Sequence, residues 1–305
     1  MKKVIITGAN GFLGGALARK LLLSGCKVIA VGTDESQLLQ LKNMGDCRPV
    51  VATFEEYNKL PEIILDHDVD AFFHFAWAGG FTTAIKDYKI QMSNASYAGD
   101  ALIAAHAIGS KKFIYANTYN QYEIANFLTS ETFEPRYTCI YAAGKTAASL
   151  ICRTLAFNLG IHYSAALIPM PYGENNYSKQ LVNIVITNLL SGVPPKLVEG
   201  NNLYDLVYID DIAEAFIAIG ERGKNMKEYY VGHRKLKTFR ELMINIRDCI
   251  APNIELNFGE YKDNQQIDYS KVDLNLLFSD TGFECKADFE KTLKRTAEWV
   301  RNNLK

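Results

Sequence analysis

The sequence predicts an α/β protein in which a parallel sheet is covered by helices on both faces. Two observations predict this class. Across residues 1–168, short apolar runs alternate with longer stretches in which apolar residues recur at helical spacing. The run at 71–75 is largely apolar along its length, as expected of a strand buried on both faces. Steady alternation of strand and helix indicates crossover connections and therefore parallel strands.

Each element follows from a local pattern. Apolar runs predict strands at residues 4–6, 27–31, 49–52, 71–75, 112–116 and 162–167. Helical spacing of apolar residues predicts helices at residues 11–24, 35–43, 57–65, 87–108 and 141–159. Gly25 is expected to end the first helix.

The chain changes character after about Pro169. Glycine, proline, asparagine and tyrosine become common, and a late strand at 206–209 precedes a helix to Ala218 that a pair of aspartates caps. The second part is therefore expected to be smaller and irregular. The parts are a sheet domain at 1–168 and a cap region at 169–305, with about 204–220 returning to pack on the sheet domain.

Composition narrows the class of protein. The 305 residues carry 33 basic and 34 acidic side chains, and 48% of them are hydrophobic. This balance excludes a disordered chain and argues against a nucleic-acid partner. The apolar stretches are too short to span a membrane. The six cysteines are scattered, so we expect no metal site and free thiols in a reducing cytoplasm.

A glycine motif lies between the first strand and the first helix. Gly8, Gly11 and Gly14 follow one another at three-residue spacing. The first glycine permits a tight turn, the second lets the backbone approach a pyrophosphate, and the third lets helix and strand pack closely. The helix N-terminus offers free N–H groups to the anion. The motif predicts dinucleotide binding by a Rossmann-type, doubly wound parallel sheet.

The end of the second strand bears on the choice between NAD and NADP. An acidic residue there would bind the ribose 2′-hydroxyl and repel a 2′-phosphate. The residues present are Gly32, Thr33, Asp34 and Glu35, with no arginine nearby. Because glycine stands where the acid is expected, the pattern favours NADP, and NAD stays open.

Tyr141 and Lys145 lie four residues apart on a predicted helix. Of the 17 tyrosines, Tyr141 is the only one followed by lysine at the fourth position. The spacing places the phenol and the ammonium on one helix face. A neighbouring cation lowers the pKa of a phenol, so Tyr141 could exchange a proton with a carbinol oxygen during hydride transfer. The alternative is an ordinary surface pair.

Together with the glycine motif, this pair resembles the extended short-chain dehydrogenase/reductase superfamily, specifically its NAD(P)-dependent nucleotide-sugar epimerases, dehydratases and reductases. The segment at 74–77 looks like the family's cofactor-lining stretch, Asn94 matches a family asparagine, and 207–211 resembles the late strand and cap. The resemblance places Thr118 as the third catalytic residue, hydrogen-bonded to the substrate carbonyl oxygen. Its alternative role is that of a turn residue at a strand end.

The resemblance implies three sets of site residues, and no metal ligand. Catalysis is expected from Thr118, Tyr141 and Lys145. Cofactor contacts are expected from Gly8, Asn10, Gly11, Phe12, Leu13, Gly14, Thr33, Phe54, Ala76, Trp77, Tyr141, Lys145 and Ile168. Substrate contacts are expected from Tyr119, Tyr172 and Asn176.

Departures from the family pattern bear on the reaction. The dehydratases carry Asp-Glu directly after the catalytic threonine, where this chain has Tyr119 and Asn120, so dehydration is disfavoured. The branch that epimerises and then reduces uses a cysteine and a histidine, where this chain has Tyr119 and approximately Asn175. A 4-keto reductase acting on a nucleotide-linked deoxyhexulose is favoured, with a nucleotide-sugar 4-epimerase as the alternative. A non-catalytic dinucleotide-binding regulator is the alternative of another class.

Two expectations concern partners. Family members often carry an arginine before the late strand that reaches the nucleotide diphosphate, and residues 202–205 contain none. Its possible replacements are Lys179, Lys196 and Arg234. The alanine-rich helices at 87–108 and 141–159 correspond to those through which the family dimerises, so the resemblance implies a homodimer.

Overall fold

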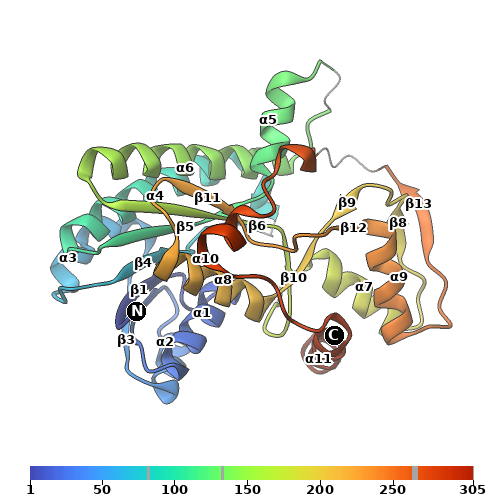
Figure 1. Cartoon of the computed structure of the whole chain (residues 1–305). Coiled ribbons are helices and arrows are strands. Elements are labelled where there is room, and N and C mark those ends of the chain that lie inside the picture. Colours follow the sequence, from blue (N-terminus) through green and yellow to red (C-terminus); the bar gives the residue numbers. More distant parts are fainter. Residues whose placement is uncertain (81–82, 132–133, 263–266, 305) are drawn as a thin grey trace.

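A seven-stranded sheet forms the centre of the molecule in the computed structural model, which describes residues 1–80, 83–131, 134–262 and 267–304. Its strand order is β11-β6-β5-β4-β1-β2-β3, and every neighbouring pair is parallel (Figure 1). The strands are β1 (Lys3–Thr7), β2 (Lys27–Gly32), β3 (Cys47–Val51), β4 (Ala71–His74), β5 (Lys112–Thr118), β6 (His162–Ile168) and β11 (Lys227–Tyr230). The first six lie within one or two residues of the predicted ranges, whereas β11 was not predicted.

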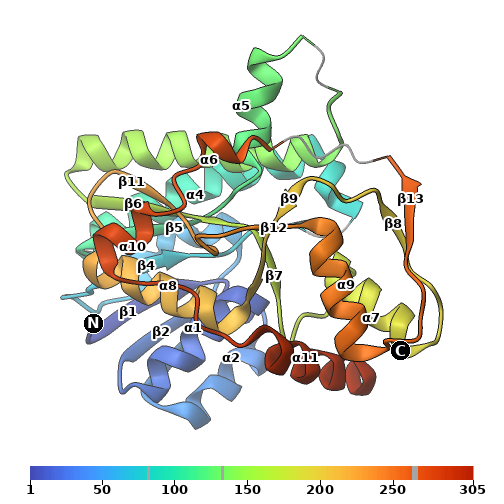
Figure 2. The ribbon, with the colours of Figure 1, turned by 45° about the vertical axis from the view of Figure 1, so that its right-hand side comes forward.

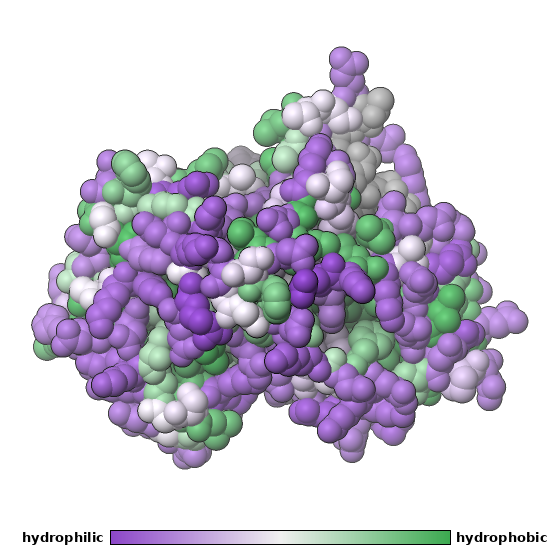
Figure 3. All heavy atoms as spheres, viewed as in Figure 1, coloured by the Kyte–Doolittle hydropathy of each residue, from purple (hydrophilic) through white to green (hydrophobic). Residues whose placement is uncertain are grey.

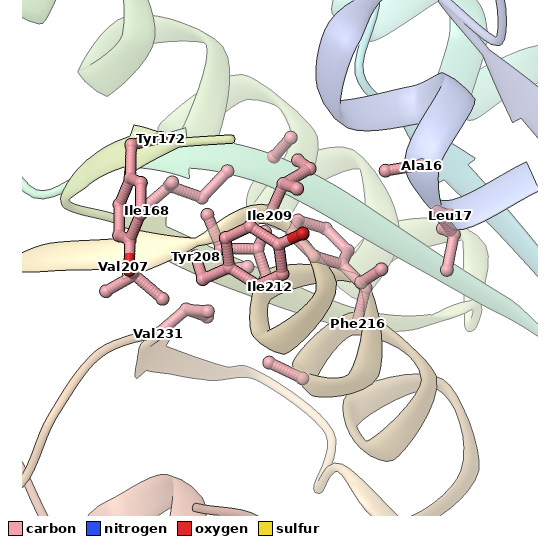
Figure 4. Close-up of a cluster of buried hydrophobic side chains, with 14 of the residues drawn as sticks. Ala16, Leu17, Ile168, Tyr172, Val207, Tyr208, Ile209, Ile212, Phe216 and Val231 are labelled. Atoms are coloured by element: carbon pink, nitrogen blue, oxygen red, sulfur yellow. The ribbon is translucent and has the colours of Figure 1, made fainter. Parts of the chain in front are cut away.

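Helices cover both faces of this sheet. Packed on one face are α1 (Phe12–Leu23), α2 (Glu35–Leu41) and α8 (Ile209–Arg222). Packed on the other are α3 (Leu60–Ile63), α4 (Tyr88–Ile108) and α6 (Thr138–Leu159). Side chains alternate along a strand, so Val4 and Ile6 enter the first core and Ile5 enters the second. Figure 4 shows Leu17 and Phe216 in the first core.

Two segments differ from the helices that were predicted. The expected helix at 57–65 is a 3₁₀ turn, η2 (Phe54–Lys59), followed by the single turn of α3, which contains Pro61. Proline is tolerated only in the first turn of a helix, so it separates the two pieces. Helix α5 (Gln121–Thr129) was not predicted, and it projects from the body of the molecule (Figure 1).

The region after β6 is built from short strands and separate helices. The strands pair in twos as β7 (Met170–Tyr172) with β10 (Leu206–Tyr208), β9 (Leu203–Tyr204) with β12 (Lys237–Thr238), and β8 (Lys196–Val198) with β13 (Asn257–Tyr261). The helices are α7 (Leu181–Leu190), α9 (Phe239–Ile250), α10 (Leu276–Thr281) and α11 (Phe289–Asn303). The predicted late strand is β10, and α8 after it packs against α1. Helices α7, α9 and α11 contact one another (Figure 2).

The surface is mixed in character. On the face shown in Figure 3, hydrophilic side chains predominate and hydrophobic ones are scattered among them. None of the helices in the described ranges is long and apolar enough to cross a membrane.

Candidate active site

A cavity of about 880 Å³ lies at the carboxyl ends of the central strands, where parallel sheets usually bind ligands. The sheet domain contributes the glycine motif, the segments after β4 and β5, and the start of α6. Ile168 at the end of β6 also lines the cavity, and the cap region contributes residues 169–171 and 176–180. The cavity therefore lies between the two parts that the sequence predicted.

The glycine motif forms the cofactor end of this cavity. Gly8 has a φ of +71°, and a Cβ atom there would lie 2.9 Å from the backbone nitrogen of Ala76. A Cβ at Gly14 would collide with the carbonyl oxygen of Gly8. Helix α1 begins at Phe12 without a side-chain cap, so its first N–H groups are available to an anion. These features fit the pyrophosphate of a dinucleotide.

Thr118 and Tyr141 meet across the cavity. Thr118 is buried at the end of β5, and its hydroxyl oxygen accepts a hydrogen bond from the backbone N–H of Asn120 at 3.3 Å. The Thr118 hydroxyl is also hydrogen-bonded to the Tyr141 phenol. Because Lys145 lines the same cavity, the structure brings the three predicted catalytic residues together.

The environment of Tyr141 differs from the prediction made from spacing alone. We expected Lys145 to lower the pKa of Tyr141. Instead, burial raises the pKa of Tyr141 above its usual value, and the hydrogen bond with Thr118 opposes this only in part. The Lys145 ammonium points elsewhere, donating to the carbonyl oxygen of Ala116 at 2.8 Å and lying 3.9 Å from the centre of the Trp77 ring. Tyr141 is therefore a protonated phenol at neutral pH.

Lys145 is one of the few lysines whose side chain is buried. Only 5% of Lys145 is exposed, and burial lowers its pKa to about 7. The carbonyl oxygen of Ala116 and the face of the Trp77 ring are its nearest compensating partners. A modest change in surroundings can therefore switch the charge of Lys145 near neutral pH.

Helix α4 holds the segment after β4 in place. The Asn94 side chain accepts from the backbone N–H of Ala78 and donates to its carbonyl oxygen, both at 2.9 Å. The indole N–H of Trp77 donates to Gln91 at 2.8 Å. Gly144 lets α6 approach α4, because a Cβ there would lie 2.8 Å from the Gln91 carbonyl oxygen. Asn94, singled out by the resemblance, thus positions the wall that carries Trp77.

His74 has no catalytic role in this arrangement. Its Nδ1 shares a 2.8 Å hydrogen bond with the Thr7 hydroxyl between neighbouring strands. Burial, together with the charge of Lys145, lowers the pKa of His74 to about 3. The ring is therefore neutral at physiological pH and belongs to the sheet core.

The structure divides the other predicted contacts into two groups. Those that line the cavity are Gly8, Gly11, Phe12, Leu13, Gly14, Trp77, Tyr119, Ile168 and Asn176. Those that lie outside its lining are Asn10, Thr33, Phe54, Ala76 and Tyr172.

Tyr172 is the clearest departure among the predicted substrate contacts. It is only 2% exposed, and its hydroxyl shares a 2.7 Å hydrogen bond with the Thr292 hydroxyl of α11. Figure 4 shows Tyr172 among the apolar side chains of the core. The resemblance implied a substrate contact for Tyr172, whereas in the structure its side chain packs in the core and its hydroxyl bonds α11.

Asn10 explains why glycine ends the second strand. A Cβ atom at Gly32 would collide with the Asn10 side-chain amide. An acid at this position would require the Asn10 side chain to move. Asp34, two residues later, caps α2 and accepts from the Gln37 backbone N–H at 3.1 Å.

Several lining residues were not predicted. They are Phe75, Lys86, Asn117, Asn120, Met170, Ser178 and Gln180, together with neighbouring residues of the same loops. The side-chain oxygen of Asn120 is buried and has no hydrogen-bond partner among the described residues. The available signal was position, since Asn117 and Asn120 flank Thr118 at the end of a predicted strand.

A second cavity of about 660 Å³ lies in the cap region. Its lining includes residues of α7, the β8 strand, Tyr204 and Arg136. Of the three cations considered for the diphosphate, Lys179 lines the first cavity and Lys196 lines the second. Arg234 lines neither cavity, and it lies 3.5 Å from Glu284 in an ion pair.

Comparison with known proteins places the chain in a family. The model of the NAD dependent epimerase/dehydratase family matches residues 4–232. A trifunctional UDP-glucose 4,6-dehydratase/UDP-4-keto-6-deoxy-D-glucose 3,5-epimerase/UDP-4-keto-L-rhamnose-reductase of Arabidopsis thaliana is 22% identical over 99% of this chain. The match covers 47% of that protein, so the chain spans about half its length.

Solved structures show the same fold over the whole chain. The UDP-N-acetylglucosamine 4-epimerase of Methanobrevibacter ruminantium superposes with a TM-score of 0.81 at 22% identity, covering 99% of each chain. A double mutant of a dTDP-glucose 4,6-dehydratase of Streptomyces venezuelae, with NAD bound, gives a TM-score of 0.79 at 22% identity. That match covers 98% of this chain and 97% of the dehydratase.

Proposed function

Because the chain belongs to the NAD-dependent epimerase/dehydratase family, a family of nucleotide-sugar enzymes, we propose that it reduces the 4-keto group of a nucleotide-linked deoxyhexulose. The observation that carries this proposal is the hydrogen bond between Thr118 and a protonated Tyr141, at the cavity into which the glycine motif opens. A bound nicotinamide would supply the hydride.

The chain's own residues supply the proton and the positioning. The Thr118 hydroxyl binds the keto oxygen as negative charge develops on it. Tyr141 donates its proton to the same oxygen, which its raised pKa favours because the phenol carries a proton at neutral pH. Lys145 lines the same cavity and is suited to bind the nicotinamide ribose. The hydrogen bond from Thr118 stabilises the phenolate that is left behind on Tyr141.

The residues after Thr118 support reduction over dehydration. Tyr119 forms a hydrogen bond with Tyr204, and burial raises the pKa of Tyr119 well above its usual value. Asn120 carries an amide and has no proton to exchange near neutral pH. Elimination of water needs an acid and a base at this place. Tyr119 and Asn120 therefore favour a reaction that consists of the hydride step without elimination of water.

The same three residues could serve a 4-epimerase, which runs the hydride step out and back with its cofactor retained. Tyr141 would donate a proton in the reductase and would both accept and donate one in the epimerase. The two reactions therefore differ in whether NADH is consumed, which the assay below measures.

For the cofactor, the geometry favours NAD over the NADP suggested by the missing acid. The Asp34 carboxylate accepts from the Gln37 backbone and side chain and from Ser36, and these hydrogen bonds lower the pKa of Asp34. It therefore keeps a negative charge at the end of β2, where NADP carries its 2′-phosphate. Solved relatives with NAD bound are consistent with this proposal.

Homodimerisation through α4 and α6 remains a proposal. The two helices pack on each other inside the monomer, and Gly99 of α4 lies against Ile151 and Leu155 of α6. Their outer surfaces still expose large apolar side chains, with Ile103 at 49% and Leu150 at 61%. Light scattering of the purified protein tests this, and a monomer at micromolar concentration would contradict it.

The test of function is an assay of the purified protein with NADH and NADPH against a panel of UDP- and dTDP-linked 4-keto-6-deoxyhexoses. We expect stoichiometric oxidation of NADH and a product reduced at C4. Interconversion of 4-epimers without net oxidation would assign the epimerase instead. Cofactor binding without turnover of any substrate in either assay would favour the non-catalytic regulator.

A further inference from the structure

The two cavities are neighbours that share a wall. Tyr119 lines the first cavity and Tyr204 lines the second. Their hydroxyl groups are hydrogen-bonded to each other, so the wall is one pair of aromatic residues thick at this point. The two cavities therefore adjoin at Tyr119 and Tyr204.

Arg136 lies beside this wall. It lines the second cavity, and its charge acts on the Tyr119 phenol that lines the first. Arg136 Nε donates to Glu123 Oε1 at 2.7 Å, and Nη2 donates to Glu123 Oε2 at 2.6 Å. Glu123 is fully buried, whereas 27% of the Arg136 side chain is exposed. The ion pair therefore has its negative end inside the protein and its positive end at the cavity.

The guanidinium retains the capacity to bind a second anion. An arginine side chain has five N–H donors, and the fork to Glu123 uses two of them. Burial opposes the charge of Arg136, but the hydrogen bonds and charge of Glu123 outweigh it, so the pKa of Arg136 is raised. Arg136 thus stays charged, and Glu123 holds its orientation.

In the part of the chain that the structure describes, the charged side chains that line the second cavity are all basic. Its charged lining residues within the described ranges are Arg136, Lys196 and Lys262, and none of those lining residues is acidic. Lys262 forms an ion pair with Glu134, and Lys196 lies 3.9 Å from Glu260. In both pairs the side chains are largely exposed to solvent, unlike Glu123 behind Arg136.

We propose that Arg136, oriented by Glu123, binds the diphosphate of the substrate at the junction of the two cavities. This inference rests on the proposed function, which puts the sugar in the first cavity beside Thr118 and Tyr141. The nucleoside then occupies the second cavity, and the diphosphate lies between them. Arginine suits this role because its planar fork matches phosphate oxygens. Arg136 would thus take the role of the diphosphate-binding arginine that is absent from residues 202–205.

The test is calorimetric titration of the full chain with UDP and with dTDP. We expect Arg136→Met to weaken the binding of whichever nucleotide the wild type binds by about 10- to 100-fold, the range for losing a charge-assisted hydrogen bond. Arg136→Lys should recover part of the affinity, because it restores the charge without the fork. NADH affinity, measured by fluorescence in the same samples, should stay within twofold.

Two further variants control for the loss of a surface arginine in general and for destabilisation of the fold. Arg234→Met removes a more exposed arginine that also pairs with a glutamate but lies outside both cavities, and it should bind like the wild type. Arg136→Met alone leaves Glu123 buried without its partner, which can destabilise the fold. The double variant Glu123→Gln with Arg136→Met removes both charges, and it should show the same loss of nucleotide affinity.

The outcomes separate this inference from the proposed function. If the wild type binds UDP or dTDP and both Arg136→Met variants bind it equally well, the role of Arg136 is overturned while the nucleotide-sugar proposal stands. If the wild type binds neither nucleotide, the nucleotide-sugar proposal fails, and the role of Arg136 fails with it.

Discussion

The two walls of the active-site cavity are built in different ways. On the sheet side, side chains are held by bonds to distant parts of the chain, such as Lys145 to the carbonyl of Ala116 and Asn94 to the backbone of Ala78. On the cap side, the bonds are local, and Asn176 bonds Ser178 and Gln180 within its own loop. The sheet side is suited to hold reacting groups rigidly, and the cap side to shape a pocket for the substrate.

The largest effect is expected on the sheet side. Tyr141→Phe removes the proton donor and should lower kcat by about 10²- to 10⁴-fold, because general acid catalysis contributes that much. NADH affinity should change little. Tyr88→Phe on the exposed surface of α4 is the matched control and should behave like the wild type. Full turnover by Tyr141→Phe would remove this residue from the mechanism.

A second sheet-side prediction concerns Lys145 and pH. Its pKa is lowered to about 7, so between pH 7 and its usual pKa the unfolded chain binds this proton and the folded protein does not. The contribution of Lys145 to the free energy of unfolding therefore rises as pH rises above 7, and this gain is lost as pH falls back towards 7. Relative to Lys145→Met, the wild type should gain as much as about 2 kcal/mol between pH 7 and pH 9 in urea unfolding. A difference independent of pH would show that Lys145 is not desolvated.

On the cap side, the effect should fall on KM. Asn176→Ala breaks the hydrogen bonds that shape its loop, and we expect KM for the sugar substrate to rise about tenfold, equivalent to one or two hydrogen bonds. The value of kcat should stay within about threefold. Asn253→Ala, an exposed position outside the lining of both cavities, is the control. A fall in kcat as large as that of Tyr141→Phe would break the distinction between the walls.

The smallest effect is expected at the adenosine end of the cofactor site. Asp34→Asn removes the charge and keeps a good helix cap, so kcat/KM with NADPH should rise by about five- to tenfold while that with NADH changes little. Asp87→Asn makes the same change at the cap of α4 and serves as the control. An NADPH preference already present in the wild type would contradict the role given to Asp34.

The sequence was most informative where local pattern determines structure. The six strands and the glycine motif were predictable because alternation and glycine spacing are local features. β11 was missed because its sequence Lys-Glu-Tyr-Tyr is half charged, and it joins the sheet only at the edge beside β6. Tyr172 was misplaced because residue type does not reveal that its hydroxyl meets Thr292, 120 residues away.

The sequence predicted which residues form the catalytic site better than it predicted their protonation and contacts. Spacing placed Tyr141 and Lys145 on one helix face, but it carries no information on burial, which reverses the expected direction of the Tyr141 pKa. The link between Arg136 and Glu123 depends on the unpredicted helix α5, which brings back residues 13 apart in the chain. Contacts that depend on burial or on the path of a loop can be predicted only when the fold is known.

Isotope transfer from the cofactor tests the central claim most directly. The protein is incubated with NADH that carries deuterium at both hydrogen positions of nicotinamide C4 and with a nucleotide-linked 4-keto-6-deoxyhexose, and the product is analysed by NMR. Our account predicts deuterium on sugar C4, with the hydroxyl proton coming from Tyr141 and solvent. A reduced product with no deuterium at sugar C4, or a cofactor that keeps both deuterium atoms while the sugar turns over, would contradict it.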